Sequence, residues 1–63
     1  MTGEQRDVYF EHIAIGHSVK VVAIDSLTAV EVSIVGPVSA AKSDLERLAL
    51  QKLKARLARD SAG

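Results

Sequence analysis

The chain is short and has no means of crosslinking itself, which limits what it can fold into. It has 63 residues and a mass of 6.7 kDa, with no cysteine for a disulfide and no cluster of metal ligands. In a domain of this size, the free energy gained by burying apolar surface roughly cancels the entropy lost on ordering the chain. Oligomerisation is the remaining way to add stability. We therefore expect one small domain that assembles with itself.

Three segments in the first half have the composition of β-strands. Residues 8–15 (VYFEHIAI) and 19–24 (VKVVAI) are rich in aromatic and β-branched side chains, and residues 29–35 (AVEVSIV) alternate between apolar and polar positions. This pattern predicts a three-stranded antiparallel meander. Each segment is followed by residues that favour turns or end strands, namely Gly16, the sequence DSLT at residues 25–28, and Gly36-Pro37.

The first of these segments does not alternate perfectly. Val8 and Phe10 have one parity, whereas Ile13 and Ile15 have the other. A bulge of one residue near residues 11–12 would bring all four apolar side chains to the same face of the sheet. We therefore expect a bulge at this position.

The last part of the chain is predicted to be helical. Residues 44–59 are good helix formers without glycine or proline. Ser43 and Glu46 have the spacing of a capping box, so Ser43 is expected to cap the helix. Together with the three strands, this predicts an α+β fold in which one helix lies across the sheet. Five apolar side chains share one face of the helix: Leu45, Ala49, Leu50, Leu53 and Leu57.

The domain organisation follows from the same pattern. We assign residues 7–60 to a single β-β-β-α domain, residues 1–6 to a polar N-terminal tail and residues 61–63 to a C-terminal tail. The first ten residues lack the apolar run of a secretory signal peptide, and no uncharged stretch is long enough to span a membrane. We expect a cytoplasmic bacterial protein that does not bind membranes.

One helix covers only one face of a three-stranded sheet, and this chain has more apolar positions than one helix can bury. Val22 and Ile24 point away from the face that the other β-branched residues of their strand share, and Leu48 lies off the apolar stripe of the helix. A second copy of the chain would cover these residues, so we predict a homodimer. The predicted interface comprises Val22, Ile24, Val30, Val32, Ile34, Leu45, Leu48, Leu53 and Leu57.

The connector between sheet and helix, residues 36–42, contains Pro37, which favours an extended chain before it. If the connector is extended, the helix of one chain can pack on the strands of the other, and this domain swapping reuses the contacts of the monomer. We therefore expect an intertwined dimer, with a side-by-side dimer as the alternative. The predicted contacts join Leu45, Leu53 and Leu57 of one chain to Val30, Val32 and Ile34 of the other.

No residue pattern of the sequence is typical of an enzyme. There is neither a G-x-S-x-G motif nor a phosphate-binding glycine motif. His12 and His17 flank the Gly16 turn and, with Glu11, suggest a metal site, but zinc sites have no such spacing, and ordinary strand and turn histidines are the simpler interpretation. A pH-sensitive interface through His12 is a further alternative. We predict no enzymatic activity, no cofactor and no metal.

Charge is distributed unevenly along a chain with no net charge. Residues 1–41 contain five acidic and two basic residues (net −3), and residues 42–63 contain three acidic and six basic residues (net +3). Lys52, Arg56 and Arg59 form a basic stripe at i, i+4 and i+7 on the predicted helix. The stripe is either a solvated helix face or a site for the phosphates of RNA or DNA. We predict an interaction or accessory protein, with a nucleic-acid-binding dimer as the alternative.

Several segments resemble a small family of short alphaproteobacterial proteins. Residues 31–37 (EVSIVGP) are the most specific of them. The family is a domain of unknown function, and some members carry an automatic label of serine hydroxymethyltransferase. The resemblance implies a β-β-β-α fold and a homodimer, and no catalytic residue. The label conflicts with the size of the chain, because a pyridoxal-phosphate enzyme needs a large pocket for its cofactor. The other similar segments are residues 8–11, 15–16, 19–21, 23–25, 48–50 and 52–53.

Overall fold

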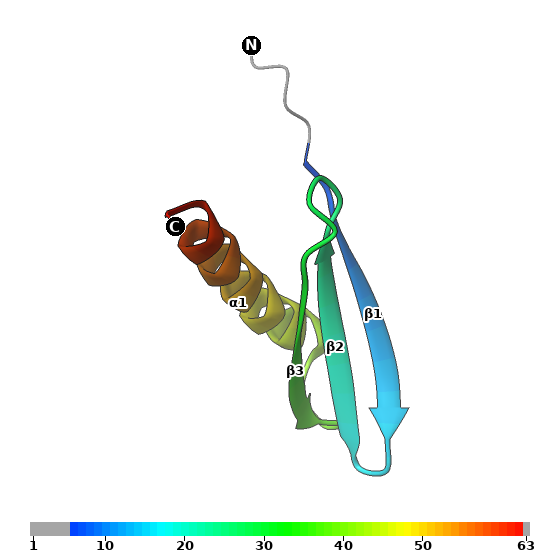
Figure 1. Ribbon diagram of the computed structural model, residues 1–63. Helices are drawn as coiled ribbons and strands as arrows, with labels where there is room; N and C mark the ends of the chain where they lie inside the picture. The colour runs from blue at the N-terminus through cyan, green and yellow to red at the C-terminus, as the bar shows by residue number, and fades with distance from the viewer. Residues whose placement is uncertain (1–5, 63) are drawn as a thin grey trace.

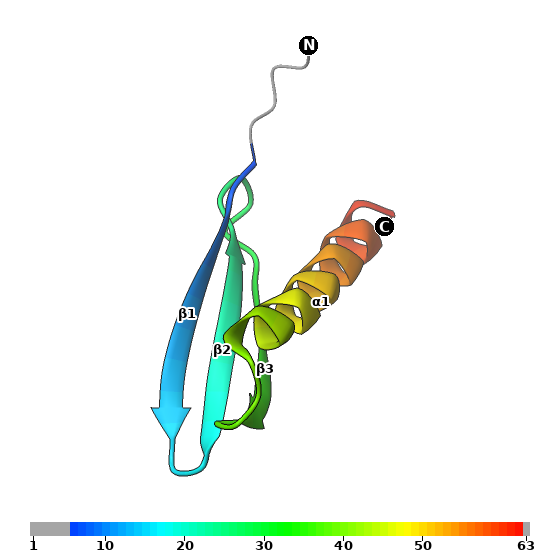
Figure 2. The same cartoon turned by 180° about the vertical axis from the view of Figure 1, so that it is seen from behind.

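The computed structural model describes residues 6–62, which fold in the order β-β-β-α (Figure 1). Strands β1 (Val8–Ile15), β2 (Ser18–Asp25) and β3 (Glu31–Pro37) are followed by helix α1 (Lys42–Ala62). The strands pair antiparallel in the order β1-β2-β3, and α1 lies across one face of the sheet (Figures 1 and 2). The α+β fold predicted from the sequence is confirmed.

The boundaries of the elements differ little from those predicted. β1 has the predicted bounds, and β2 is one residue longer at each end. β3 begins and ends two residues later than predicted, and it ends at Pro37, which has no N–H to continue the ladder. Helix α1 extends to Ala62, into the segment expected to be a C-terminal tail. Within residues 6–62, no helix combines the length and the apolar composition needed to cross a membrane.

β1 pairs with β2 residue by residue along its whole length. The bulge expected near residues 11–12 is therefore wrong. Because the pairing is unbroken, Val8 and Phe10 point toward α1, whereas Ile13 and Ile15 point to the opposite face. The imperfect alternation of β1 thus reflects a strand with apolar side chains on both faces.

The core lies between α1 and the sheet. β2 is the central strand, and its residues Val21 and Ala23 are 0% exposed. Ala49 brings the helix backbone close to the strands because its side chain is small, and Leu53 is the largest fully buried side chain among the described residues. The buried core cluster consists of Val21, Ala23, Val32, Leu45, Ala49 and Leu53.

Two turns connect the strands, and both use a residue with positive φ. Gly16 has a φ of 59° at the first position of the two-residue turn between β1 and β2, which is where a type II′ turn requires glycine. The turn predicted at residues 25–28 is confirmed. Ala29 N donates to Asp25 O at 2.8 Å, and Ala29 has a φ of 63°.

Helix α1 begins earlier than the capping box suggests. Ala41 O accepts hydrogen bonds from Asp44 N at 3.1 Å and Leu45 N at 3.2 Å, so Ala41 is the N-cap residue that directly precedes the helix. Ser43 lies inside the first turn, and its predicted role as N-cap is wrong. The connector before the helix folds back in a turn, in which Ala40 N donates to Pro37 O at 3.0 Å.

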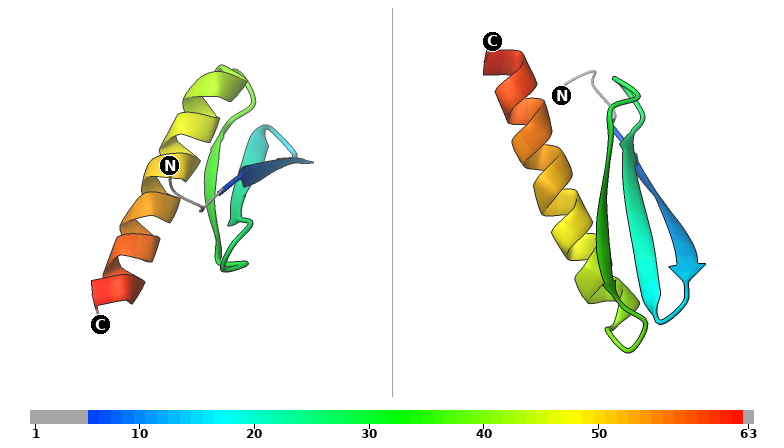
Figure 3. Two further views of the ribbon diagram at one scale, coloured as in Figure 1. Left: turned by 90° about the horizontal axis from the view of Figure 1, so that it is seen from above. Right: turned by 60° about the horizontal axis from the view of Figure 1, so that its bottom comes forward.

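The helix does not cover the sheet evenly. It packs against β3 and β2, and β1 is the strand farthest from it (Figure 3). The C-terminal half of α1 diverges from the sheet toward the end where the β2–β3 loop lies (Figures 1 and 3). This geometry leaves the opposite face of the sheet and the outer edge of β1 uncovered by the helix.

Candidate functional site

The face of the sheet that points away from α1, here called the open face, carries exposed apolar side chains beside polar ones such as Glu11 and Lys20. Val22 and Ile24 lie on it at its centre, as predicted, and Val22 is only 6% exposed because the neighbouring strands flank it. Contiguous exposed apolar side chains are typical of interaction surfaces. Four large hydrophobic side chains of the open face are exposed: Tyr9 (57%), Ile13 (44%), Ile15 (54%) and Val35 (65%).

The outer edge of β3 is protected by the chain itself. Asp25 N donates to Val30 O at 2.9 Å, and because bonded pairs alternate along an antiparallel ladder, the backbone groups of Ser33 point outward. Ser33 O accepts a hydrogen bond from Lys52 Nζ at 2.7 Å, and Pro37 at the end of the strand has no N–H. Lysine and proline are residues that commonly protect a sheet edge from further pairing.

Within residues 6–62, the outer edge of β1 has no such protection. Ser26 N donates to Asp7 O at 3.0 Å, so the pair just before β1 is hydrogen-bonded. Since bonded pairs alternate, the N–H and C=O groups of Phe10, His12 and Ala14 point away from β2. β1 is eight residues long and contains neither lysine nor proline. It is therefore a free edge that can pair with another strand.

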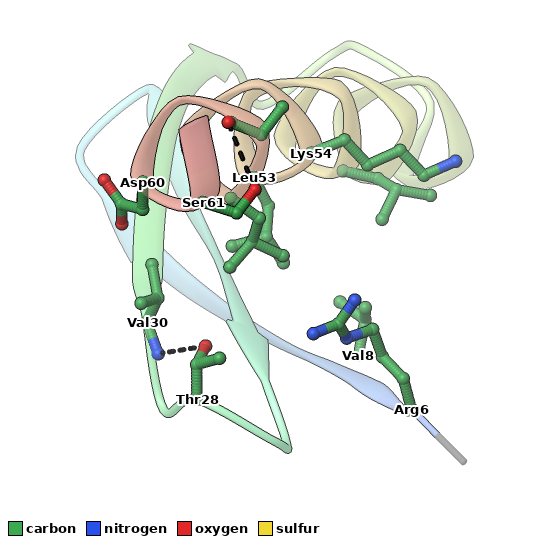
Figure 4. A pocket seen from close by; sticks show the side chains of 11 residues that line it. Arg6, Val8, Thr28, Val30, Leu53, Lys54, Asp60 and Ser61 are labelled. Atoms are coloured by element: carbon green, nitrogen blue, oxygen red, sulfur yellow. Dashed lines mark hydrogen bonds between the residues drawn. The ribbon is translucent and has the colours of Figure 1, made fainter. Parts of the chain in front are cut away.

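A groove of about 700 Å³ opens between the C-terminal half of α1 and the strand ends beside the β2–β3 loop (Figure 4). Leu53 of the helix faces Val8 of β1 and Val30 of the β2–β3 loop, and Arg6 and Lys54 bring positive charge to the rim. Among the described residues that line the groove there is no histidine or cysteine. The groove is thus an apolar surface with a charged rim. The described residues that line it include two hydroxyl groups, those of Thr28 and Ser61, but no imidazole that could activate them.

A buried carboxylate lies at the same end of the sheet. Asp25 is 0% exposed, and its Oδ2 accepts hydrogen bonds from the Thr28 amide at 3.0 Å and the Thr28 hydroxyl at 2.7 Å. Arg6 Nε lies 2.8 Å from Asp25 Oδ1, an ion pair that lacks the alignment of a hydrogen bond. Arg6 therefore ties the residues before β1 to the end of β2.

These contacts lower the pKa of Asp25 below its ordinary value of 3.8. The hydrogen bond from the Thr28 hydroxyl is the largest cause, and the Thr28 amide and the positive charge of Arg6 act in the same direction. Burial of the carboxyl group opposes them by raising the pKa. Because the folded chain binds this proton less tightly than the unfolded chain, ionised Asp25 stabilises the fold above the ordinary pKa.

This stabilisation is expected to disappear in acid. As the pH falls below about 4 and through the lowered pKa of Asp25, the free energy of unfolding should decrease. Thermal unfolding followed by circular dichroism at several pH values, on the natural chain and on Asp25→Asn, checks this. The natural chain should be the more stable at neutral pH, and the difference should shrink toward pH 3. A difference that is independent of pH would contradict the role given to Asp25.

The basic stripe predicted on the helix is largely engaged within the chain. Lys52 Nζ binds Ser33 O at the edge of β3, and Arg56 Nε pairs with Asp60, 3.1 Å from Oδ2 and 3.3 Å from Oδ1. Arg59 lies exposed in the last turn of α1. Two of the three side chains thus have protein partners, and these contacts do not favour a phosphate-binding surface.

The two histidines have different surroundings. His12 Nε2 lies 3.0 Å from Glu46 Oε2, which links β1 to the first half of α1. His17 is in the exposed turn after β1, and Glu11 is on the open face, opposite to the side on which His12 points. The structure therefore does not place His12 and Glu11 at one site. Among residues 6–62, no group of three or more His, Cys, Asp or Glu side chains could hold a metal ion.

Most residues of the predicted dimer interface make contacts within the single chain. Val22, Ile24 and Leu48 lie outside the core, and Leu48 is 52% exposed. Helix exchange would use the same helix–sheet contacts between chains, so it stays a prediction. Of the nine residues of the predicted interface, six lie between α1 and the sheet of the same chain: Val30, Val32, Ile34, Leu45, Leu53 and Leu57.

Two features of the strand ends beside the β2–β3 loop, the buried Asp25 and the groove, are not apparent from the sequence. The DSLT sequence indicates a turn, but it does not indicate that the buried carboxylate of Asp25 pairs with Arg6, which is 19 residues earlier in the chain. An acidic residue at the end of a strand, with threonine three residues later, is the signal for a capped turn. The groove has no sequence signal, because it depends on the angle between α1 and the sheet.

The sequence pattern of a domain of unknown function, DUF6898, matches residues 5–60. Because this match covers most of the 63 residues, the chain belongs to the DUF6898 family. A family of unknown function is what the resemblance implied. No curated protein and no solved structure matches the chain.

Proposed function

We propose that this member of the DUF6898 family is a small non-enzymatic protein that works as a homodimer and serves as an interaction or accessory protein. The observation that carries this proposal is the incomplete cover of the sheet, which leaves Tyr9, Ile13 and Ile15 exposed on one strand. A chain of 63 residues without disulfides gains stability from assembly. A second copy is a partner present wherever the chain is made.

The chemistry of the groove supports the non-enzymatic part of the proposal. Its charged side chains are mostly paired within the chain, Arg6 with Asp25 and Asp60 with Arg56. Enzymes generally place a nucleophile or a proton donor beside a base in such a cavity. The residues that line this groove provide apolar contact area and positive charge instead.

The connector supports a dimer in which each helix stays on its own sheet. Ala40 N donates to Pro37 O at 3.0 Å, and Val38 N donates to His17 O at 2.9 Å. Both hydrogen bonds hold the connector in its folded-back form, and helix exchange would require at least the first of them to open. We therefore propose the side-by-side dimer, and the exchanged dimer is the alternative.

Sedimentation equilibrium of the full chain at micromolar concentrations tests the dimer. The expected mass is twice the 6.7 kDa of one chain. The unfolding temperature should also rise with protein concentration, because the folded state is stabilised by association. A mass of 6.7 kDa throughout, together with a cooperative unfolding transition that does not depend on concentration, would contradict the proposal.

The same preparation tests the nucleic-acid alternative. Because Lys52 and Arg56 are engaged within the chain, titration with short RNA and DNA at low salt should give no binding. Affinity that falls steeply with added salt and is lost in Arg59→Ala would instead identify the basic stripe as a phosphate-binding surface.

A further inference from the structure

We propose that the surface joining the two copies is the free edge of β1, and that the two β1 strands pair antiparallel about His12 to form one continuous six-stranded sheet. This inference rests on the proposed homodimer and names the surface that forms it. Pairing of strand edges satisfies backbone groups that otherwise only water can bind. It therefore adds hydrogen bonds as well as apolar contacts.

The two edges of the sheet differ in their ability to pair. At β3, Lys52 Nζ donates a hydrogen bond to the carbonyl of Ser33, and Pro37 has no N–H to donate. At β1, the outward backbone groups belong to Phe10, His12 and Ala14, and α1 packs on the other two strands. Only β1 offers an uninterrupted row of donors and acceptors among the described strands.

Symmetry limits the registers that this pairing can have. Two antiparallel β1 strands related by a two-fold axis perpendicular to the sheet place residues of the same parity opposite each other. The axis then passes midway between one residue of β1 and the same residue of the second copy. The longest overlaps of the eight-residue strand occur when this residue is Glu11 or His12.

The side chains favour the register centred on His12. With Glu11 on the axis, its carboxylate would lie directly opposite that of the second copy, and like charges in that position are destabilising. With His12 on the axis, Glu11 lies opposite Ile13, and Tyr9 lies opposite Ile15. The latter is an aromatic and β-branched pair, which is a favourable cross-strand combination. Phe10 then lies opposite Ala14, which leaves room for the ring.

The position of the helix is compatible with this arrangement. The axis perpendicular to the sheet places both copies of α1 on the same face, each over its own β2 and β3. Because β1 is the strand farthest from α1, the two helices are separated by the paired β1 strands (Figure 3). The open faces of the two copies lie together on the other side of the joined sheet, where each Tyr9–Ile15 pair reduces the exposure of both side chains.

Charge substitution distinguishes pairing at the β1 edge from packing of the open faces. In the His12 register, Ile13→Glu places a carboxylate opposite Glu11 of the second copy, twice in each dimer, so the dimer dissociation constant should rise about tenfold. Val35→Glu is the matched control, because Val35 also lies on the open face and, like Ile13, pairs with Lys20. It should leave the dissociation constant unchanged. Glu11→Lys added to Ile13→Glu should restore dimerisation.

Two other results of these experiments would contradict the proposal. If Ile13→Glu and Val35→Glu weaken the dimer equally and Glu11→Lys does not restore it, the copies join through their open faces, and pairing at the β1 edge is wrong. If the natural chain itself is a monomer by sedimentation, the proposed function fails as well. Circular dichroism of each variant verifies that its fold is intact.

Engineered cysteines test the register directly, because the natural chain contains none. Residues 11 and 13 of opposite strands form a close, non-hydrogen-bonded pair in the His12 register, at a spacing that suits a disulfide. A mixture of Glu11→Cys and Ile13→Cys chains should therefore crosslink under mild oxidation, and each variant alone should not. Crosslinking of Glu11→Cys alone would place Glu11 on the axis and overturn the His12 register. Absence of any crosslink in a confirmed dimer would overturn pairing at this edge.

Discussion

Replacing Leu53 with alanine is expected to lower the free energy of unfolding by about 2 to 5 kcal/mol. Leu53 is 0% exposed and is the largest fully buried side chain among the described residues, at the centre of the contacts between α1 and the sheet. Domains of this size have about 3 to 9 kcal/mol of stability in total. The variant should therefore be largely unfolded at temperatures where the natural chain is folded, as measured by circular dichroism and urea unfolding.

Leu48→Ala is the matched control for this substitution. Leu48 is on the same helix and is 52% exposed, so the same change should alter the free energy of unfolding by less than about 0.5 kcal/mol. The β1-edge dimer also leaves Leu48 free. If the two variants lost stability equally, Leu53 would not be at the centre of the core, and the packing of α1 on the sheet would be incorrect.

Replacing Gly36 with alanine is expected to lower the free energy of unfolding by about 1 to 3 kcal/mol. A Cβ atom at this position would lie 2.5 Å from Leu45 Cδ2, and Leu45 is only 5% exposed, so it has little space into which to move. Gly36 thus allows the first turn of α1 to approach the end of β3. Urea unfolding of Gly36→Ala measures the loss.

The same substitution in a Leu45→Val background identifies the cause. Valine has no Cδ atoms, so the added methyl group at residue 36 should cost much less than it does beside leucine. An equal cost in the two backgrounds would mean that the loss comes from the backbone of residue 36, and that the close approach to Leu45 has no energetic effect.

The elements and their faces could be predicted from the sequence because the apolar pattern has the period of each element. Alternation of Val30, Val32 and Ile34 placed these residues on the helix-facing side, where they pack against the core. The same reasoning placed Val22 and Ile24 on the open face. Periodicity is a local property, so a single sequence is sufficient to show it.

The incorrect predictions share a physical cause. The bulge in β1 was expected on the assumption that its apolar side chains face one core, whereas Ile13 and Ile15 belong to a second apolar face. Ser43 was expected to cap the helix on local spacing, but the turn at Ala40 allows the helix to begin at Lys42. In both cases tertiary structure decides between locally acceptable alternatives.

The candidate site was harder to predict than the fold. The groove and the burial of Asp25 depend on where α1 and Arg6 lie relative to the strand ends, which the pattern of the chain does not specify. The predicted meander already places β1 at an edge, and its lack of lysine and proline was readable from the sequence. The difference between the two edges was not predicted, because it depends on the contact of Lys52 with Ser33.

Amide hydrogen exchange of the natural chain tests the central claim, that β1 is the strand through which two copies pair. The N–H groups of Phe10, His12 and Ala14 point away from β2, so among the described strands of one chain they have no partner. At dimer-forming concentrations these three amides should be protected from exchange, and the protection should fall on dilution. Rapid exchange of the three amides in a confirmed dimer, while the amides of β1 that face β2 stay protected, would contradict the account.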